Sequence, residues 1–382
     1  MVTIQDISTT VYKLPLHGKL RWGKHSVLHD VRHVLVHVRL SDGAEGVAEA
    51  PPRPTIYGET IHSITSIIEQ ELKPRLVGQS AADLSAMYQI KNNHTAKGAL
   101  DMAVHDARAQ SQGVSLLTHL MGIGDWRLEI GDSSRITHHA SRNAHHAIRV
   151  SYILGIGDDD TVLAEAQRVF EQGVRVLKVK VGRDWDADLR RIRALQEMFA
   201  GEMAIYADAN ECLGLDTAVS QLSLLAEMGV LYCEEPLPVE MIQERAQLRA
   251  GNHLPMIADD STFTVRDLRR EMALDTFDIL NIKTARTGYT ESLQMLAMAQ
   301  QAGKSVMIGS QASSALGTAR AGIFAALPGV DCPSELSFFL KLKEDIVQKR
   351  PLIVDGWMDV AQLMEIKVDE DLLKDAEVEI GD

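Results

Sequence analysis

The chain has 382 residues, of which 45% are hydrophobic and 24% are charged, and it carries a formal net charge of −14 at pH 7. This length predicts two or three domains with a sizeable core, and the composition excludes a disordered or collagen-like chain. The acidic balance argues against nucleic acid as a partner, because negative surface charge repels phosphate backbones.

The N-terminal region, residues 1–127, is predicted to form an α+β domain. It starts with MVTIQDISTT, which has neither the basic nor the apolar segment of a secretory signal. Alternating valines over 34–38, turn residues over 41–43 and an apolar run over 46–50 predict a β-hairpin. Apolar residues at helical spacing predict a helix over 61–72 that ends before Pro74, and a second helix through 99–107 that Gly113 ends.

Residues 128–148 are polar and rich in histidine, and they show no clear hydrophobic period. We therefore predict an insertion that connects two domains. Its histidine pairs, His138-His139 and His145-His146, have no cysteine or acid at zinc-ligand spacing, so we expect a solvated loop or an oligomer contact there.

From residue 149 to about 350 the chain repeats one unit, which consists of a short apolar run, a polar cluster and an amphipathic helix. Strands are predicted over 174–181, 204–207, 231–233, 256–258, 279–282 and 306–308. Strands that alternate with helices predict a parallel sheet, and about seven units favour a (β/α) barrel over a doubly wound sheet. Residues 351–382 end in an acidic segment, which either returns to the first domain or forms a solvated tail.

Charged residues recur after the apolar runs of the predicted barrel. They are, in chain order, Lys180, Asp208, Glu234, Asp259, Lys283 and Glu335, at spacings of 28, 26, 25, 24 and 52 residues. Because the carboxyl ends of barrel strands form one mouth, these groups should converge there. A single acid after a strand is usually a helix N-cap or a solvated residue, but caps do not explain a near-constant spacing in which lysines bracket three acids.

The order of these residues predicts proton chemistry beside a metal ion. Three carboxylates from successive strands can bind one hard cation, for which Mg²⁺ is the expected ion and Mn²⁺ a substitute. Lysine becomes a base near neutral pH when it is desolvated or held near other cations. A lysine that faces a metal-bound carboxylate predicts abstraction of the proton α to that carboxylate, through an enediolate-type intermediate.

At these residues the sequence resembles the enolase superfamily, in the muconate lactonizing enzyme subgroup of the mandelate racemase/muconate lactonizing enzyme family, whose sites use lysine bases with Mg²⁺. The matching motifs are Lys178-Val179-Lys180, Asp208-Ala209-Asn210, Glu234-Glu235-Pro236, Asp259-Asp260-Ser261 and Ile282-Lys283. The resemblance covers nearly the whole chain. It implies an α/β fold with a modified TIM-type (β/α) barrel (149–350), an N-terminal α+β capping domain (1–127) and a C-terminal segment (351–382) that returns to the capping domain.

The resemblance also assigns roles to single residues. The expected metal ligands are Asp208, Glu234 and Asp259, surrounded by Asn210, Glu235 and Asp260. Lys180 and Lys283 are the expected acid/base groups on opposite faces of the substrate, Lys178 keeps Lys180 basic, and Glu335 completes the catalytic set. Specificity is expected from two capping-domain loops, 17–27 and 51–59, which contain Arg21, Trp22, Arg53 and Tyr57.

The subgroup contains cycloisomerases, racemases or epimerases, and dehydratases. Its dipeptide epimerases carry Asp-x-Asp at the end of the eighth strand, whereas this chain has Glu335-Leu336-Ser337 there, which resembles a cycloisomerase. We therefore expect a muconate-type cycloisomerase that acts on a small carboxylate. The alternative is a racemase or epimerase of N-acylamino acids, dipeptides or proline derivatives, because Ser337-Phe338-Phe339 replaces the glycine-rich stretch that usually follows.

A non-catalytic binding protein on the same scaffold is the alternative from a different class, and the complete set of lysines and carboxylates argues against it. Three cysteines without a C-x-x-C pair, Cys212, Cys233 and Cys332, indicate a reducing compartment and no structural zinc site. No run of about 18 apolar residues is present, so we expect no membrane partner. The expected protein is a cytoplasmic homo-oligomer.

Overall fold

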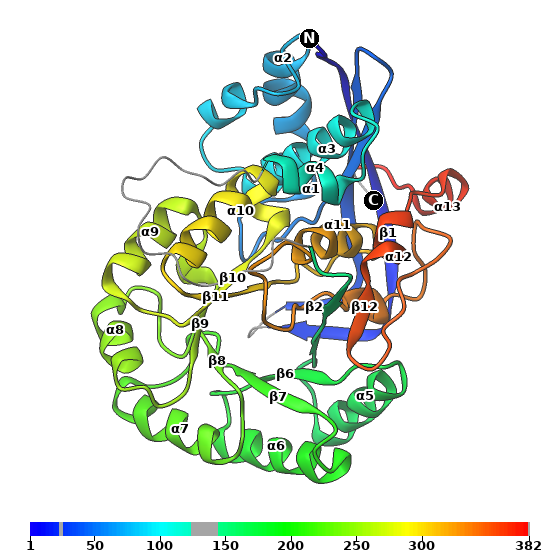
Figure 1. Cartoon of the computed structure of the whole chain (residues 1–382). Coiled ribbons are helices and arrows are strands. Elements are labelled where there is room, and N and C mark those ends of the chain that lie inside the picture. Colours follow the sequence, from blue (N-terminus) through cyan, green and yellow to red (C-terminus); the bar gives the residue numbers. More distant parts are fainter. Residues whose placement is uncertain (23–25, 124–143, 381–382) are drawn as a thin grey trace.

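The computed structural model describes residues 1–22, 26–123 and 144–380 of the chain. Figure 1 shows an N-terminal domain, drawn in blue and cyan, beside a barrel of strands and helices, drawn from green to orange. The barrel confirms the predicted TIM-type fold class, with a separate α+β domain at one end.

A three-stranded antiparallel sheet forms the base of the N-terminal domain. Its strands are β1 (Ile4–Trp22), β2 (Ser26–Leu40) and β3 (Glu45–Ala50), in the order β1-β2-β3. The predicted hairpin is confirmed as β2–β3, in which Val34 pairs with Ala50 and Val38 with Gly46. The loop predicted over 17–27 is instead largely the end of the β1–β2 hairpin, where Leu20 pairs with Leu28.

Helices cover this sheet. They are α1 (Ile61–Ile67), the π-helical turn η1 (Ile68–Leu72), α2 (Lys73–Leu76), the 3₁₀ turn η2 (Ser85–Gln89), α3 (His94–Ser111) and α4 (Leu116–Ile123). The predicted end before Pro74 is wrong, because the helical path continues to Leu76. Proline lies in the first turn of α2, where a missing backbone N–H is tolerated.

Seven parallel strands form the curved sheet of the barrel, in the order β11-β10-β9-β8-β7-β6-β5. They are β5 (Tyr152–Ile153), β6 (Val176–Lys180), β7 (Ala204–Asp208), β8 (Cys233–Glu234), β9 (Met256–Ala258), β10 (Ile279–Ile282) and β11 (Ser305–Ile308). The segment 331–335 lies where an eighth strand would close the barrel, because Glu335 N donates to Ile308 O and Ser334 bridges Val150.

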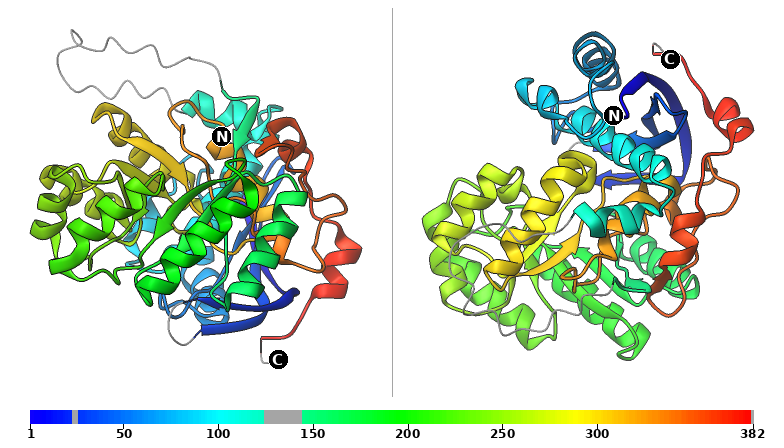
Figure 2. Two further views of the ribbon diagram at one scale, coloured as in Figure 1. Left: turned by 90° about the horizontal axis from the view of Figure 1, so that it is seen from below. Right: turned by 45° about the horizontal axis from the view of Figure 1, so that its top comes forward.

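The outer layer of the barrel consists of helices that follow the strands (Figure 2). They are α5 (Asp159–Glu171), α6 (Trp185–Phe199), α7 (Leu215–Glu227), α8 (Ile242–Ala250), α9 (Val265–Leu274), α10 (Thr284–Gln301) and α11 (Ala315–Ala325), with the 3₁₀ turn η3 (Asp260–Thr262) after β9. The sequence explains α6 well. Asp184 caps it by accepting from Ala187 N, an apolar face including Ile192 is buried, and Gly201 follows its end with φ +89°.

The C-terminal part of the chain runs back across both domains. It contains η4 (Phe338–Lys341), β12 (Trp357–Asp359), α12 (Val360–Glu365) and α13 (Glu370–Ala376). Strand β12 pairs with β4 (Ala147–Arg149), so residues 147–148 of the predicted insertion belong to a strand. Its residues 128–143, with His138 and His139, lie outside the described residues, while His145 and His146 are exposed. Near the C-terminus, Glu377 bridges Tyr12 of β1.

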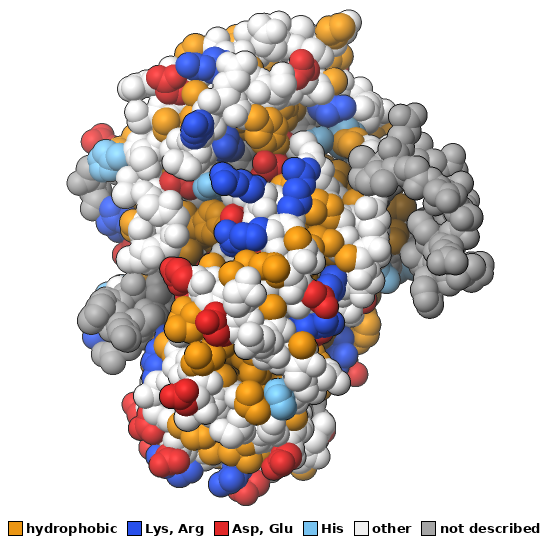
Figure 3. All heavy atoms as spheres, turned by 90° about the vertical axis from the view of Figure 1, so that its left-hand side faces the viewer, with side chains coloured by type: hydrophobic (Ala, Val, Ile, Leu, Met, Phe, Trp, Pro, Cys, Tyr) orange, Lys and Arg blue, Asp and Glu red, His pale blue; other side chains and the backbone are white. Residues whose placement is uncertain are grey.

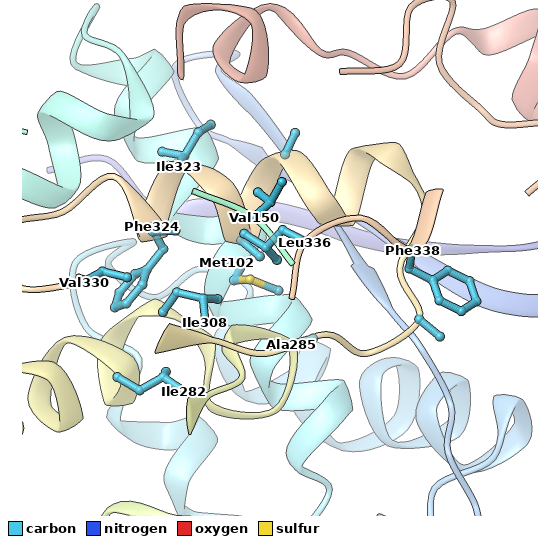
Figure 4. Packing of buried hydrophobic residues seen from close by; sticks show 14 of the residues in the cluster. Met102, Val150, Ile282, Ala285, Ile308, Ile323, Phe324, Val330, Leu336 and Phe338 are labelled. Carbon is cyan, nitrogen blue, oxygen red and sulfur yellow. The ribbon is translucent and has the colours of Figure 1, made fainter. Parts of the chain in front are cut away.

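A continuous core joins the two domains. Figure 4 shows Met102 of α3 among Ile308, Leu336 and Val150 of the barrel. On the face drawn in Figure 3, charged side chains of both signs alternate with hydrophobic ones, and several Lys and Arg side chains gather near its middle. Within the described residues, no helix has the length and apolar character needed to cross a membrane.

Candidate active site

The charged residues predicted at the strand ends lie along one edge of the barrel sheet. Lys180 ends β6, Asp208 ends β7 and Glu234 ends β8, while Asp259 and Lys283 directly follow β9 and β10. Since β6 to β10 are consecutive neighbours, the three acids stand side by side and the two lysines flank them. This arrangement follows from parallel strands of matched register, in which Lys180 is opposite Asp208 and Asp208 is opposite Glu234.

Lys178 holds the centre of the cluster. Its Nζ lies 3.0 Å from Asp208 Oδ2, 2.6 Å from Glu234 Oε1 and 2.5 Å from Glu335 Oε1. Lys178 is 2% exposed, so the charge of its ammonium group is stabilised by these carboxylates in place of water. Glu335 is fixed in turn by Tyr206, whose hydroxyl donates to Oε1 at 3.0 Å, and by Ser310 N. The fold thus places Glu335 in the cluster, although it lies 52 residues after Lys283 in the sequence.

The two flanking lysines have different partners. Lys180 Nζ donates to Asp208 Oδ2 at 2.5 Å and to Asn210 Oδ1 at 2.8 Å. Lys283 Nζ donates to Asp259 Oδ2. Each lysine thus contacts one carboxylate of the acid cluster, Lys180 from one side of the cluster and Lys283 from the other.

The cluster shifts the pKa values of its acids in opposite directions. Burial alone would raise the pKa of Asp259, but Lys283 and Arg286 outweigh burial and lower it to about 2. Lys178 and Lys180 outweigh burial in the same way and lower the pKa of Asp208. For Glu234, burial and the nearby carboxylates Asp208, Glu335 and Asp259 outweigh Lys178 and raise the pKa well above its usual range. The positive charge near Glu234 therefore does not offset its burial and the neighbouring carboxylates.

The residues around Glu234 fit a hard cation. Three buried carboxylates provide the oxygen ligands that such an ion prefers. The positive charge of a divalent ion would also stabilise the ionised form of Glu234. Beside them, the buried amide oxygen Oδ1 of Asn281 has no hydrogen-bond partner in the described part of the chain, while Asn281 Nδ2 donates to Glu234 Oε2. Within the described residues, no three His, Cys, Asp or Glu side chains already stand in a metal-binding arrangement. The acids are drawn toward lysines instead.

The residues expected around the metal ligands support the cluster from outside. Asn210 accepts from Lys180, and its own backbone N–H donates to Asp208 Oδ1. Glu235 Oε1 accepts from Asp259 N, Ser261 N and Ser261 Oγ, and burial raises its pKa to about 7. Asp260 lies 3.7 Å from Arg286, across the loop that follows β9.

A cavity of about 500 Å³ opens above the cluster. Its wall contains Lys178, Lys180, Asp208, Glu234, Asp259, Asp260, Lys283 and Glu335 from the barrel, and Leu20, Arg53, Thr55, Ile56 and Tyr57 from the N-terminal domain. The predicted loop 51–59 therefore does face the site. Arg53 also donates to the backbone oxygens of Gln311 and Ala312, and Gln311 Nε2 donates to the Tyr57 hydroxyl, so both residues tie this loop to the barrel. The side chains of Arg21 and Trp22 lie outside the described ones.

Two cations of this region were missed by the sequence reasoning. Arg286 is 1% exposed; its Nη2 donates to Asp259 O at 3.0 Å, and its guanidinium lies over the Phe263 ring. It sits one helical turn after Lys283, which is the signal that could have found it. Lys341 lines the cavity from η4, within the apolar run 338–342, where a lone lysine is a weak signal.

Comparison with known proteins places this site in a known context. The model of the "Mandelate racemase / muconate lactonizing enzyme, N-terminal domain" matches residues 9–122, and the "Enolase C-terminal domain-like" model matches residues 161–364. The solved structure of muconate lactonizing enzyme from Mycobacterium smegmatis with muconolactone is 31% identical, with a TM-score of 0.86, and the match covers 99% of this chain and 100% of that one.

Curated relatives include enzymes with other reactions. The L-Ala-D/L-Glu epimerase of Bacillus subtilis (strain 168) is 28% identical over 84% of each chain. The N-succinylamino acid racemase of Thermus thermophilus is 27% identical over 94% of this chain and 92% of its own. These relatives are all isomerases, but their reactions differ from one another.

Proposed function

The chain belongs to the mandelate racemase/muconate lactonizing enzyme family of the enolase superfamily, whose enzymes are generally metal-dependent, and from this premise we propose that it is a muconate-type cycloisomerase. Its relatives are isomerases, which agrees with a metal-dependent isomerase. The proposal adds the reaction, the Mg²⁺ ion and the roles of single residues. In this proposal, the enzyme acts on the proton α to a substrate carboxylate through an enediolate-type intermediate.

One observation supports the proposal above all: two lysines flank three buried carboxylates at the mouth of the barrel. In our proposal, Asp208, Glu234 and Asp259 hold Mg²⁺, which, when bound, stabilises negative charge on the substrate carboxylate. Lys180 gives or takes the proton at the α-carbon from one side. Lys283 faces the other side, where a cycloisomerase needs only its positive charge. Lys178 keeps Lys180, two residues away on β6, in place by sharing Asp208.

The cavity favours an anionic substrate. Its wall carries six cationic side chains, Arg53, Lys178, Lys180, Arg183, Lys283 and Lys341, against five acids, Asp208, Glu234, Asp259, Asp260 and Glu335. With a divalent ion added, the balance becomes strongly positive, which suits a dicarboxylate. A dipeptide is less suitable because its ammonium needs a carboxylate. Glu335, which occupies the position where dipeptide epimerases carry Asp-x-Asp, is already engaged by Lys178 and Tyr206.

The alternative, a racemase or epimerase of N-acylamino acids, fits the same charge balance, since an N-succinylamino acid also carries two carboxylates. The two reactions differ in how they use the lysines. A racemase needs both, because one removes the proton and the other returns it to the opposite face. A cycloisomerase needs only one to move a proton.

The test follows deuterium incorporation in D₂O, face by face, with cis,cis-muconate and with N-succinylamino acids. We expect turnover of muconate, no exchange into product in Lys180→Ala, and slower turnover in Lys283→Ala with the same face exchanged, a loss of about 3 kcal/mol in transition-state stabilisation. Lys304→Ala is the control, since Lys304 pairs with Asp275 just before β11, at the opposite end of the barrel. If each lysine variant still exchanges one enantiomer of an amino-acid substrate and loses the other, the enzyme is a racemase.

A further inference from the structure

Lys341 is a cation of the cavity wall that stands outside the strand-end cluster. Lys341 ends η4, six residues after Glu335, and its side chain faces the same cavity as Lys178 and Lys180. Its Nζ lies 2.5 Å from Glu165 Oε1, on α5, and 4.3 Å from the centre of the Tyr152 ring. Within the described residues, its ion pair is with Glu165 and not with the acids at the strand ends.

The surroundings of Lys341 hold its ammonium in a fixed place. The residue is 7% exposed, and Glu165 is itself fixed by Tyr152 OH at 2.6 Å and by Gly155 N at 3.1 Å. Burial alone would lower the pKa of Lys341, but Tyr152 and Glu165 outweigh burial and raise it. A buried ammonium is costly to desolvate, and in ligand pockets the few charged groups of the wall fix the orientation of the ligand.

The charges of this group leave a positive excess. Arg168 of α5 donates to the Tyr152 hydroxyl at 3.2 Å and to Leu340 O at 3.2 Å, so a second cation stands behind Lys341. Glu165 pairs with Lys341 directly and is linked to Arg168 only through the Tyr152 hydroxyl. An ammonium has three donors, and one of them meets Glu165, so Lys341 retains a donor for a ligand oxygen.

The segment that carries Lys341 is also the one where this sequence departs from the usual cycloisomerase pattern. Ser337-Phe338-Phe339 replaces the expected glycine-rich stretch. Ser337 Oγ donates to Ser151 O, which fixes the start of η4 against the residue before β5. Phe338 also lines the cavity, so the wall here combines an apolar ring with one fixed cation.

We propose that Lys341 binds the second carboxylate of a dicarboxylate substrate. In a cycloisomerase, one oxygen of this carboxylate adds to the conjugated carbon chain to close the lactone, while a proton adds at the carbon α to the first carboxylate. This inference rests on the proposed function, because it assumes that the first carboxylate lies at the strand-end cluster. It makes Lys341 a specificity residue that selects substrates with a negative charge at both ends. Glu165, Tyr152 and Arg168 position its ammonium.

The experiment measures binding by calorimetry and turnover in parallel, with Mg²⁺ present, for two ligands: cis,cis-muconate and its monomethyl ester, which lacks one charge. For Lys341→Met, we expect muconate binding to weaken about 10- to 100-fold and ester binding to change less than about 3-fold, as expected for the loss of one charge-assisted hydrogen bond. Equal losses for both ligands, or no loss for either, would overturn the proposal.

Lys304→Met is the matched control. Lys304 is also largely buried, with a side chain 9% exposed; its Nζ lies 2.5 Å from Asp275 and 5.2 Å from the Phe277 ring centre, but it lies outside the cavity wall. It should leave the ratio of the two affinities unchanged. A shift of that ratio as large as in Lys341→Met overturns the proposal.

Glu165→Gln provides a second variant that keeps the test independent of folding losses in Lys341→Met. It removes the anion that competes for Lys341, so the preference for muconate over its ester should increase; an unchanged preference overturns the proposal.

Wild-type protein that binds muconate better than the ester but turns over neither refutes the cycloisomerase and supports the subsite. Wild-type protein that turns over muconate but binds muconate and the ester equally well refutes the subsite alone.

Discussion

At the scale of single residues, Glu234 differs from the two acids beside it. Asp208 and Asp259 each contact a lysine that lowers their pKa, whereas the pKa of Glu234 is raised by burial and by the neighbouring carboxylates. A divalent cation would reverse this shift, because an opposite charge nearby favours the ionised form. The metal would then take over part of the lysine contacts of these three acids.

We therefore expect Asp208→Asn, Glu234→Gln and Asp259→Asn each to weaken Mg²⁺ binding by about 100-fold or more and to reduce turnover by about 1,000-fold. Calorimetric titration with MgCl₂ and an activity assay measure both effects, and removal of metal with a chelator should abolish activity reversibly. Asp216→Asn, an exposed acid in the first turn of α7, is the control and should change neither. Three variants that bind Mg²⁺ like the wild type would refute the assignment.

The sequence predicted which residues would stand at the mouth because each charged group directly follows an apolar run, and parallel strands align their ends. It could not predict Lys341 or Asn281. Lys341 belongs to an irregular segment without periodicity, and Asn281 is one polar residue inside β10. Their roles depend on which side chains meet across the barrel, and a local sequence pattern does not predict those contacts.

At the scale of elements, α10 is broken just after the turn that carries Lys283. Gly288 has φ 60° and ψ −170°, a conformation open almost only to glycine. Asp101 of α3 fills the space beside it, and its Oδ2 accepts from Tyr289 N at 2.5 Å and Thr290 N at 3.0 Å. This carboxylate caps the second part of α10 and fixes the direction of the first turn.

Gly288→Ala should therefore destabilise the protein by about 3 kcal/mol and reduce turnover, because the new Cβ would lie 2.5 Å from Asp101 Oδ2 in a strained backbone. Thermal unfolding and the exchange assay measure the two effects. The control, Gly303→Ala, also has positive φ, +66°, but nothing lies within 4 Å of its Cβ, so it should cost only about 1 kcal/mol. Equal losses in the two variants would show that Asp101 has no part in the effect.

Two strands of the barrel were predicted to the residue, since 256–258 and 279–282 are buried apolar runs between polar clusters and are observed as β9 and β10. The run 231–233 is observed instead as β8 at Cys233–Glu234, and the short strand β5 was not predicted. The long β1–β2 hairpin was not predicted either. Residues 17–27 contain glycines and several charged side chains, which locally favour a loop. The backbone pairs Leu20 with Leu28 nonetheless, because strand pairing continues from the sheet below.

At the scale of the whole molecule, the site depends on how the N-terminal domain sits on the barrel. Glu49 of β3 forms a buried junction: it accepts from Ser314 N at 2.9 Å, at the start of α11, and from Tyr12 OH at 2.5 Å. The loop 51–59, which lines the cavity, follows Glu49 directly. No pattern in the sequence predicts this junction, because Glu49 lies in an otherwise ordinary strand and its partners are distant in the chain.

Removing this carboxylate should lower the stability of the protein and, through the loop 51–59, its activity, without touching the residues of the strand-end cluster. Glu49→Ala leaves Ser314, Tyr12 and His33 without their buried partner, so we expect a loss of about 3–5 kcal/mol in unfolding free energy and lower activity through displacement of the loop. Denaturant unfolding measures the loss. Glu45→Ala on the same strand, whose side chain is 50% exposed, is the control and should stay within about 0.5 kcal/mol of wild type.

The same junction predicts a dependence on pH. Burial would raise the pKa of Glu49, but His33, Ser314 and Tyr12 outweigh burial and lower it to about 2, against 4.5 for an unperturbed carboxyl group. A lowered pKa in the folded state means that the ionised group stabilises the fold above about pH 4.5 and that this contribution is lost as the pH falls toward 2. The stability difference between wild type and Glu49→Gln should therefore be largest at pH 5–7 and shrink at lower pH. A difference that stays constant from pH 6 to pH 3 would show that the charge of Glu49 does not hold the two domains together.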